Sequence, residues 1–580
     1  MRLQLSIQLP RLSTAQLLHE HTLKPTPHRA TSAHAMLKVF ADNGIDRTYI
    51  VPGESYLGVL DALSDFGEID VVVCRHEGGA AFMAVVDGRL TGRPGLVMVS
   101  RGPGATNASI GVHAAQQDGV PLILIVGQIP KADLRKEAFQ EIDYQKMFGH
   151  MAKWVYEVTT PEDLAPAAFK AVRIATEGTP GPVVLVIPED VQQQVVGLPE
   201  WISSPAERAL PTAHTLQRIE DLLDHAARPL IIAGSAIARR EDGRAALLAF
   251  AEKFNLPVVV SFRQNDLFPN NHPLYAGHLD LAIPNEQVEA YASSDLVLAL
   301  GTRLGDITTQ GYTFPSFPRP GQTLVHCVAD GQSLNKTFAA DIGVAIDAVD
   351  LMACLCKQEL SRSQPDKRTS WAKSLREIQD TSARWPFSAP RDGVFFPTAV
   401  KALQNQAPDN LVICLDSGIF ASSVYKNFEF TGIQRLLASC SGAMGYGIPA
   451  SVVVQMRSPT SRVVCMVGDG GFLMTGNEII AAVDRNLPIL VILSNNNCYG
   501  SIRAHQNRFY PDRHAVGTTL TNPDFIALAR ALGATAERVE AENQLEAALQ
   551  RGLNATGPYV LEIKTSLDAT LAKQQPVGDS

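Results

Sequence analysis

VGDGGF, residues 467–472, follows directly on the apolar run VVCM, and LSNNNCYG, residues 493–500, follows the apolar run PILVI. Both runs are short, continuous and rich in β-branched residues, which is typical of parallel strands buried on both faces. Asp469, Asn495 and Asn496 therefore stand at the carboxyl ends of two strands. That edge is where open α/β sheets bind their ligands.

The residue types at this edge suit a hard cation that carries a phosphate. Asp469 offers a carboxylate, an asparagine offers an amide oxygen, and the loop offers a carbonyl. Such a partly filled oxygen site suits Mg²⁺, which keeps its other positions for phosphate oxygens and water. Gly470 and Gly471 let backbone N–H groups approach an anion at the start of the next helix. A lone GDG would indicate a plain turn, but the NN stretch favours a metal and phosphate site.

The same strand rhythm runs along most of the chain. Apolar, β-rich runs alternate with segments long enough for crossover helices: DVVVC, GLVMVS, PLILIVG, PVVLVIP, PLIIAG, LPVVVSF, DLVLALG, LVICLD, VVCMVG, PILVILSN and YVLEIKT. Two polar, proline-containing stretches interrupt it, LPEWISSPAERALPT and SRSQPDKRTSWAKSLREIQDTSARWPFSAP. We therefore expect an α/β protein with three doubly wound parallel-sheet domains, over residues 32–200, 210–358 and 385–570. VSRGPGATN and MVGDGGF open similar strand–turn–helix units, which favours a duplication of the first domain as the third.

The composition excludes several classes of protein. The chain has 580 residues, is 46% hydrophobic and 19% charged, and carries a net charge of −9. It is too apolar for a mainly disordered chain and lacks a basic stripe, so we expect no nucleic acid and no membrane as partner. The eight cysteines form no CxxC pair, which suits a cytoplasmic location. Residues 1–31 are expected to be a disordered or extended leader, with a transit peptide as the alternative.

The two stretches together resemble the motif of thiamine-diphosphate enzymes, in which GDG is followed downstream by NN. The likeness is closest to the acetolactate synthase and pyruvate oxidase group and covers about residues 32–570. It implies that Asp469, the side chain of Asn496 and the main-chain carbonyl of Cys498 bind Mg²⁺. It also implies that thiamine diphosphate is bound by the following residues: Glu77, Gly418, Met444, Gly468, Gly470, Gly471, Asn496, Tyr499 and Gly500.

CRHEGGAA, residues 74–81, places Glu77 just after another predicted strand. On the residues alone, a Glu in the first turn of a helix usually complements the helix dipole. The resemblance implies a catalytic role instead, in which Glu77 hydrogen-bonds N1′ of the cofactor's aminopyrimidine and exchanges a proton with it. Met444, in SCSGAMGYGIPA, resembles the bulky residue that bends the cofactor, although alone it would be interpreted as a core methionine.

Three further segments bear on the substrate. EAFQE matches the family closely and implies that Phe139 and Gln140 lie at the substrate pocket, with Gln140 catalytic. PGES replaces the PGGAS of acetolactate synthases, so Glu54 adds a carboxylate beside the expected pocket residue Ser55. His505 stands where those enzymes carry a Trp that shapes the acceptor site. The middle domain has no clear GxGxxG, so FAD, which many relatives bind there, is doubtful.

The resemblance therefore implies an enzyme that decarboxylates a 2-oxo acid and transfers the acyl unit to an acceptor, with both partners small molecules. Within the family, a 2-oxo acid decarboxylase or a flavin-dependent oxidase remains an alternative. A non-catalytic assembly subunit is the alternative from another class, and the joint presence of Glu77, Asp469 and Asn496 speaks against it. Because the resemblance implies that Glu77 of one subunit meets the diphosphate bound by another, we expect a homodimer or a dimer of dimers.

Overall fold

The computed structural model describes residues 29–198, 208–281, 283–358 and 365–572. Nearly all of the predicted leader lies outside these residues. Its last residues form β1 (Arg29–Thr31), which pairs antiparallel with β8 (Val195–Gly197).

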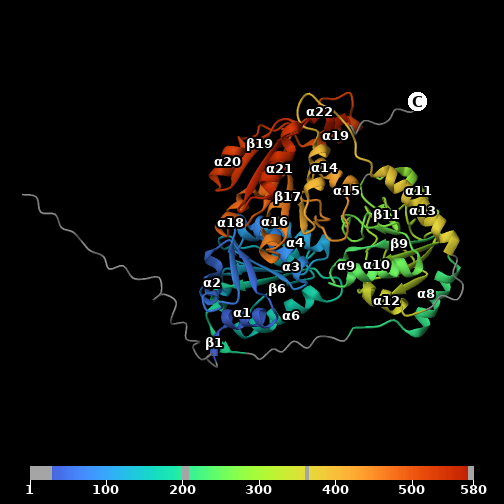
Figure 1. The fold of residues 1–580 in the computed structure, drawn as a ribbon. Helices are drawn as coiled ribbons and strands as arrows, with labels where there is room; N and C mark the ends of the chain where they lie inside the picture. Colours follow the sequence, from blue (N-terminus) through green and yellow to red (C-terminus); the bar gives the residue numbers. More distant parts are fainter. Residues whose placement is uncertain (1–28, 199–207, 282, 359–364, 573–580) are drawn as a thin grey trace, which may run out of the picture.

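Three six-stranded parallel sheets confirm the predicted fold class (Figure 1). The strand orders are β3-β2-β4-β5-β7-β6, β11-β10-β9-β12-β13-β14 and β16-β15-β17-β18-β20-β19. In each sheet the order reverses beside its first strand, as in doubly wound folds. The loops that follow the two strands on either side of this reversal meet at the carboxyl edge of the sheet, where they can form a binding site.

In the N-terminal domain, successive residues of a strand point into two different cores. Val97 and Val99 pack with α3 and α4, whereas Leu96 and Met98 pack with α1 and α6. This burial on both faces explains the continuous apolar runs. The strands are β2 (Arg47–Ile50), β3 (Asp70–Val73), β4 (Gly95–Val99), β5 (Leu122–Gln128), β6 (Trp154–Glu157) and β7 (Pro182–Pro188). The helices are α1 (Ser32–Asp42), α2 (Leu57–Leu63), α3 (Glu77–Thr91), α4 (Pro103–Asp118), α5 (Tyr144–Phe148), α6 (Leu164–Thr176) and α7 (Glu189–Gln192).

The central domain includes a long helix beyond the range expected for it. The Arg368 guanidinium of α13 donates to backbone carbonyls of this domain, and the Trp371 indole N–H donates to the Pro229 carbonyl at 2.8 Å. The strands are β9 (Pro229–Ala233), β10 (Val258–Val260), β11 (Tyr275–His278), β12 (Leu296–Leu300), β13 (Thr323–Cys327) and β14 (Ile342–Val344). The helices are α8 (Ala213–His225), α9 (Ser235–Ala238), α10 (Gly243–Phe254), α11 (Asn285–Ala292), α12 (Ala348–Leu355) and α13 (Pro365–Ser382).

The C-terminal domain repeats the layered arrangement of the N-terminal one. Its strands are β15 (Leu411–Leu415), β16 (Arg435–Leu437), β17 (Arg462–Gly468), β18 (Leu490–Asn495), β19 (Thr535–Val539) and β20 (Tyr559–Lys564). Its helices are α14 (Phe396–Gln406), α15 (Ser422–Asn427), α16 (Gly447–Arg457), α17 (Asp469–Thr475), α18 (Ile479–Asp484), α19 (Gly500–Phe509), α20 (Phe525–Ala531), α21 (Leu545–Leu553) and α22 (Leu567–Ala572). Across the described residues, no helix is both long enough and apolar enough to cross a bilayer.

The first and third domains share one hydrophobic core. In Figure 1 helices α3 and α4 of the first domain lie beside α16 of the third. Helix α3 packs against α16, and the rings of Phe82 and Tyr446 meet edge to face at 5.8 Å. Arg457 on α16 pairs with Asp87 and Asp46 of the N-terminal domain. Two domains far apart in the sequence are therefore held rigidly side by side.

Candidate functional site

Asp469 lies at the first residue of α17, directly after β17, as the GDG motif predicts. Its side chain is buried, with 3% of the residue exposed. The carboxylate accepts hydrogen bonds from the backbone N–H groups of Gly470 at 2.9 Å and Cys498 at 3.3 Å. Burial raises the pKa of Asp469, because the charged carboxylate is largely removed from water, while its hydrogen bonds act in the opposite sense.

The turn after β18 brings the NN motif to the same place. The Cys498 N–H that points at Asp469 also donates to the Asn496 Oδ1, at 3.1 Å. The Asp469 carboxylate and the Asn496 amide oxygen therefore share one donor. The Cys498 carbonyl accepts from the Gly500 N–H at 2.8 Å, which leaves one of its two lone pairs free.

Glycines let the surrounding backbone close around this point. A Cβ on Gly470 would lie 2.3 Å from the Tyr499 ring and 3.3 Å from the Met444 methyl. A Cβ on Gly500 would lie 3.3 Å from the Asn496 Nδ2. Gly468 and Gly418 both lie against the Phe420 ring, and Gly471 lies against Asp416. The residues predicted to bind the cofactor in this domain are thus brought together, at one edge of the sheet.

Asp416, at the end of β15, was not singled out from the sequence. Its carboxylate accepts from the backbone N–H groups of Ser417 at 2.6 Å, Gly445 at 3.1 Å and Gly447 at 3.0 Å. It therefore ties the Gly418 turn to the segment that carries Met444. Burial raises the pKa of Asp416 to about 6. The signal in the sequence was an acidic residue ending an apolar strand, as at Asp469.

Asn522, in the loop before α20, was also missed. Its Nδ2 donates to Asp469 at 2.9 Å, to Asn495 at 3.0 Å and to Asn497 at 3.1 Å. Its Oδ1 is buried and has no hydrogen-bond partner among the residues that the structure describes. No motif marks this residue, because the loop meets the site only in the folded domain.

The donor set fits a magnesium ion. The carboxylate of Asp469 and the amide oxygen of Asn496 are hard oxygen donors that meet at the Cys498 N–H, and the carbonyl of Cys498 is a third donor on the same residue. No ion pair to Asp469 occurs among the described residues, so a bound cation would supply the missing charge. One carboxylate with phosphate oxygens and water is the usual environment of Mg²⁺.

Glu77 opens α3 at the carboxyl edge of the N-terminal sheet. It is half-buried, its Oε2 accepts from the Asn107 amide at 2.9 Å, and a Cβ on Gly104 would lie 3.4 Å from its Oε1. The SRGPGATN turn and the RHEGG turn therefore lie side by side at the carboxyl edge of the sheet, although β2 separates the strands that precede them. The backbone before Glu77 is held by Glu478 of the C-terminal domain, a contact that sequence reasoning missed.

The predicted substrate residues lie in different surroundings. Gln140 lies against Gly102 at the start of α4, where a Cβ would come within 2.7 Å of the Gln140 carbonyl oxygen. Phe139 beside it is 76% exposed. Ser55 is buried, and its Oγ accepts from the Arg101 N–H at 3.0 Å. His505 is exposed on α19 and stacks on Phe509 with ring centroids 6.0 Å apart.

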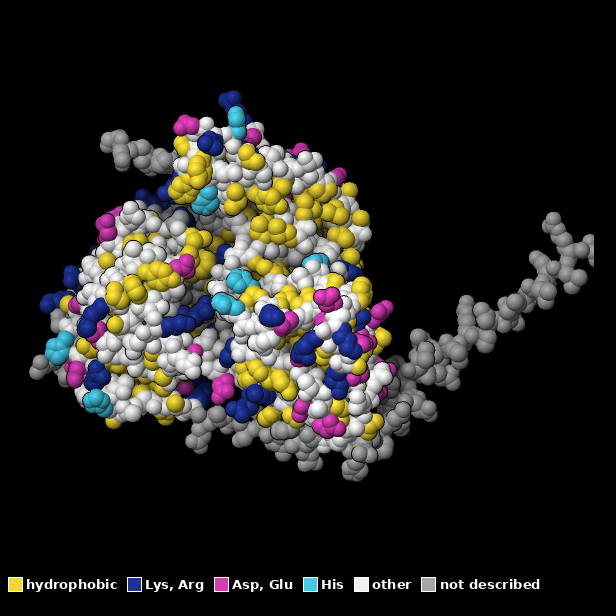
Figure 2. Space-filling model, turned by 180° about the vertical axis from the view of Figure 1, so that it is seen from behind, with side chains coloured by type: hydrophobic (Ala, Val, Ile, Leu, Met, Phe, Trp, Pro, Cys, Tyr) yellow, Lys and Arg dark blue, Asp and Glu magenta, His cyan; other side chains and the backbone are white. Residues whose placement is uncertain are grey.

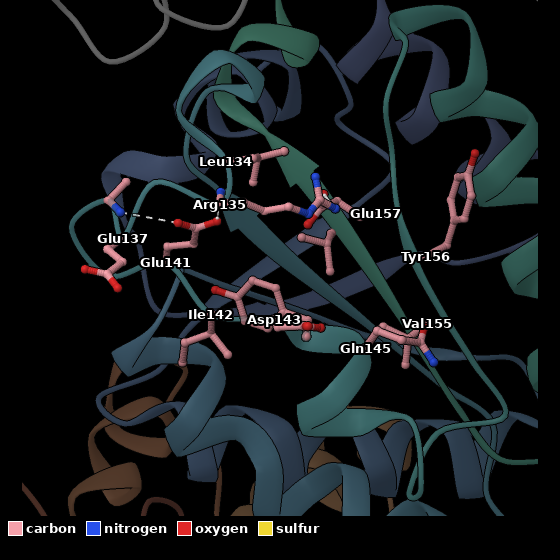
Figure 3. Close-up of a pocket in the computed structure, with 13 residues that line it drawn as sticks. Leu134, Arg135, Glu137, Glu141, Ile142, Asp143, Gln145, Val155, Tyr156 and Glu157 are labelled. Atoms are coloured by element: carbon pink, nitrogen blue, oxygen red, sulfur yellow. Dashed lines mark hydrogen bonds and ion pairs between the residues drawn. The ribbon is translucent and has the colours of Figure 1, made fainter.

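A cavity of about 730 Å³ lies between the loop before α5 and strand β6, and Glu141 and Glu157 are among the residues that line it (Figure 3). Glu141 turns back onto its own loop and accepts from the backbone N–H groups of Arg135 at 2.5 Å and Ala138 at 3.3 Å. Arg135 also approaches Glu157 on β6 at 3.8 Å. None of the predicted site residues lines this cavity, so we assign it no catalytic role.

Each of the three domains matches a model of one protein family. Residues 30–147 match the thiamine pyrophosphate enzyme N-terminal TPP binding domain, and residues 216–355 match the central domain of that family. Residues 416–563 match the C-terminal TPP binding domain. The last match spans Asp416, Asp469, Asn496 and Asn522.

Several curated proteins resemble the chain over nearly its whole length. The acetolactate synthase isozyme 3 large subunit of Escherichia coli (strain K12) is 30% identical over 535 residues, which are 90% of this chain and 92% of the relative. The isozyme 2 large subunit of the same organism is 29% identical over 522 residues, 90% of this chain and 93% of the relative. The mitochondrial acetolactate synthase catalytic subunit of Saccharomyces cerevisiae (strain ATCC 204508 / S288c) is 27% identical over 564 residues, 92% of this chain and 80% of the relative.

Proposed function

Because the chain belongs to the thiamine pyrophosphate enzyme family, we propose that it is a carboligase that uses thiamine diphosphate and Mg²⁺. In this proposal it decarboxylates a 2-oxo acid and transfers the acyl unit to an acceptor. The acetolactate synthase names of its relatives support this reaction class.

One observation carries the proposal. The single N–H of Cys498 donates to both the Asp469 carboxylate and the Asn496 amide oxygen. Asp469 follows β17 and Asn496 follows β18, so oxygen donors from the ends of two neighbouring strands meet at one point, where they can share one ligand. Asp469, Asn496 and the Cys498 carbonyl would hold Mg²⁺, and the glycine-lined backbone at Gly470 would approach the diphosphate.

The chain's own groups have separate tasks. When bound, thiamine diphosphate supplies the electron sink for decarboxylation. Glu77 would hold a proton at a carboxyl oxygen for N1′ of the aminopyrimidine, and the Asn107 amide orients that carboxyl group from the other side. The Met444 methyl group lies close to Gly470, on which the Tyr499 ring also packs. From there Met444 would support the bent cofactor. Tyr499 would cover the diphosphate side.

The substrate would meet the N-terminal domain. Gln140 and Phe139 stand on the loop beside the first turn of α4, and Phe139 is free to cover a bound molecule. Ser55 would act indirectly, because its Oγ accepts a hydrogen bond from the Arg101 backbone N–H and so fixes the turn before α4. His505 would face the acceptor from α19.

We also propose that the active protein is a homodimer or a dimer of dimers. Large apolar side chains are exposed near both halves of the site, on Ile110 of α4 and on Leu473 and Met474 of α17. Figure 2 shows hydrophobic side chains gathered on the C-terminal lobe. Exposed apolar patches of this kind commonly mark protein interfaces.

All eight cysteines are free thiols, which supports the proposed cytoplasmic location.

The test uses purified full-length protein with thiamine diphosphate, Mg²⁺ and a panel of 2-oxo acids with aldehyde and 2-oxo acid acceptors. Mass spectrometry identifies the products. An acyloin or acetohydroxy acid supports the carboligase. A free aldehyde alone would point to the decarboxylase, and peroxide formed with added FAD to the oxidase. If the protein binds thiamine diphosphate but turns over no 2-oxo acid, the proposed reaction is wrong.

A further inference from the structure

Glu478 is a fully buried carboxylate at the end of the 3₁₀ turn Gly476–Glu478, which follows α17 directly. Its carboxylate reaches across to the N-terminal domain. There it accepts from the backbone N–H of His76 at 2.9 Å and from that of Arg75 at 3.1 and 3.2 Å. These are the two residues that immediately precede Glu77.

We propose that Glu478 is a positioning residue that, from the C-terminal domain, fixes the backbone turn presenting Glu77. The inference rests on the proposed function only for the role given to Glu77. Glu478 touches neither the reacting groups nor the magnesium ligands, so it acts through the turn alone.

The sequence of α3 is adapted to this contact. A Cβ on Gly79 would lie 2.6 Å from the Glu478 Oε1 and 2.7 Å from its Cγ, so a glycine is needed where the carboxylate lies against the helix. The His76 ring completes the turn, because its Nδ1 accepts from the Gly78 N–H at 3.0 Å. The backbone on both sides of Glu77 is thus bound by side chains.

A carboxyl group is well suited to hold the backbone N–H groups of Arg75 and His76. Hydrogen bonds from N–H groups to a charged acceptor are stronger than neutral ones, and they matter most where water is excluded. Burial raises the pKa of Glu478 to about 7, while the Arg75 and His76 N–H groups act in the opposite sense and the Glu77 carboxylate adds to the rise. The other charged groups around the turn are Arg75, which pairs with Asp484 of α18 at 3.2 Å, and Arg485.

A second contact between the same domains provides a matched control. The Arg485 guanidinium binds the Asp70 carboxylate through two hydrogen bonds, of 2.8 and 3.0 Å. This ion pair also joins the end of α18 to the N-terminal sheet, but it lies at the start of β3 and not at the Glu77 turn. If Glu478 serves only adhesion between domains, losing either contact should have the same effect.

The experiment compares the full-length Glu478→Leu, Glu478→Gln, Gly79→Ala and Arg485→Met variants with the wild type. Hydrogen exchange of the peptide over residues 71–80, measured without cofactor, reports the turn directly. We expect exchange about ten- to a hundredfold faster in Glu478→Leu, since the hydrogen bonds from two backbone N–H groups to the Glu478 carboxyl group are lost. Gly79→Ala should accelerate it too, because the methyl group displaces the carboxylate. Glu478→Gln keeps an acceptor oxygen and should restore most protection, and Arg485→Met should leave it at the wild-type level.

Steady-state kinetics give the second readout, if the wild type turns over a 2-oxo acid. Glu478→Leu should lower kcat about tenfold or more and leave the KM for the 2-oxo acid nearly unchanged, because a displaced Glu77 impairs proton exchange and not substrate binding. Wild-type exchange in both Glu478→Leu and Gly79→Ala would overturn the proposal, as would equal acceleration in Arg485→Met. If Glu478→Leu does not fold, the hydrogen exchange of Gly79→Ala alone decides whether the proposal holds. A wild type inactive on every 2-oxo acid would refute the proposed function, while the exchange data would still decide on Glu478.

Discussion

The Asp469 carboxylate and the Asn522 amide are joined by a hydrogen bond of 2.9 Å between Oδ2 and Nδ2. The same amide nitrogen donates to Asn495 and Asn497. One side chain from a distant loop therefore holds the end of β17 and the turn after β18 in a fixed relation. Partners of this kind orient metal ligands and tune their affinity.

We expect Asn522→Leu to lower the Mg²⁺ affinity of the protein about 10- to 100-fold, because Asp469 loses the group that orients it. Calorimetry with Mg²⁺ in the presence of thiamine diphosphate measures the change. Asn554→Leu, at an exposed asparagine after α21, is the control and should bind as the wild type does. Equal affinity in both variants would show that Asn522 plays no part in the site.

Asp469→Asn should abolish Mg²⁺-supported binding of thiamine diphosphate, because Asp469 is the only charged group in the proposed ligand set. The apo variant should be at least as stable as the wild type, since it removes a buried charge that makes no ion pair within the described part of the chain. Calorimetry and thermal unfolding measure the two effects. Asp409→Asn, an exposed change before β15, serves as control. Undiminished cofactor affinity in Asp469→Asn would exclude this magnesium site.

Glu77→Gln should keep the fold and most cofactor binding but slow deuterium exchange at C2 of bound thiamine diphosphate by about 10²–10⁴-fold, the usual share of general acid–base catalysis. Quenching in acid followed by NMR reports this exchange. A role limited to the helix dipole would instead cost at most about 1 kcal/mol of stability and leave the exchange intact. Glu68→Gln, at an exposed residue before β3, controls for the loss of one charge. Exchange at the wild-type rate would remove Glu77 from the mechanism.

Much of the fold follows from the sequence because strands buried on both faces are continuously apolar. Every apolar run that predicted a strand is one in the structure. The strands that were missed carry polar residues or lie at sheet edges, as β6, β16 and β19 do. Glu537 and Arg538 break the apolar run of β19, and β16 has only three residues, so the sequence carries a weaker pattern there.

The local part of the site was also predictable, because GDG and NN end neighbouring strands. Asn522 and Glu478 were not, since each reaches the site through packing between segments distant in the sequence. Asp416 is intermediate: its place at a strand end was visible, but its three backbone donors come partly from the Gly445–Gly447 turn. The spacing of residues in a sequence motif does not predict contacts between segments that are far apart in the sequence.

Mixing Glu77→Gln with Asp469→Asn should restore activity if each site takes Glu77 from one subunit and Asp469 from another. Random exchange makes half of the dimers hybrid, each with one intact site, so about a quarter of wild-type activity is expected. Native mass spectrometry verifies the exchange. Hybrid dimers without activity would contradict sites shared between subunits, and each variant alone sets the background.

Stability should depend on pH through Glu478. Burial raises its pKa from the ordinary 4.5 to about 7, so between those values the folded protein keeps a proton that the unfolded chain releases. Raising the pH through this window therefore lowers the free energy of unfolding, by about 3 kcal/mol for the full shift.

Glu478→Gln removes this titration and should be the more stable protein above about pH 7, with its advantage vanishing toward about pH 4.5. Urea unfolding at a series of pH values measures the difference between the two proteins. Glu68→Gln, an exposed change, should give a constant difference across the series. A difference for Glu478→Gln that stays constant with pH would refute the assignment.

A single segment of the chain begins at Asp469 and ends at Glu478, with α17 and one 3₁₀ turn between them. Each helical residue advances the chain by about 100° around the axis, so one added or deleted residue would turn Glu478 away from the Arg75 and His76 amides. Apart from Asp469, Gly470, Gly471 and Glu478, side chains within the segment can vary, but its length cannot. Insertions and deletions should therefore be absent here among homologues that keep both carboxylates, and loop-length engineering should begin elsewhere in the domain.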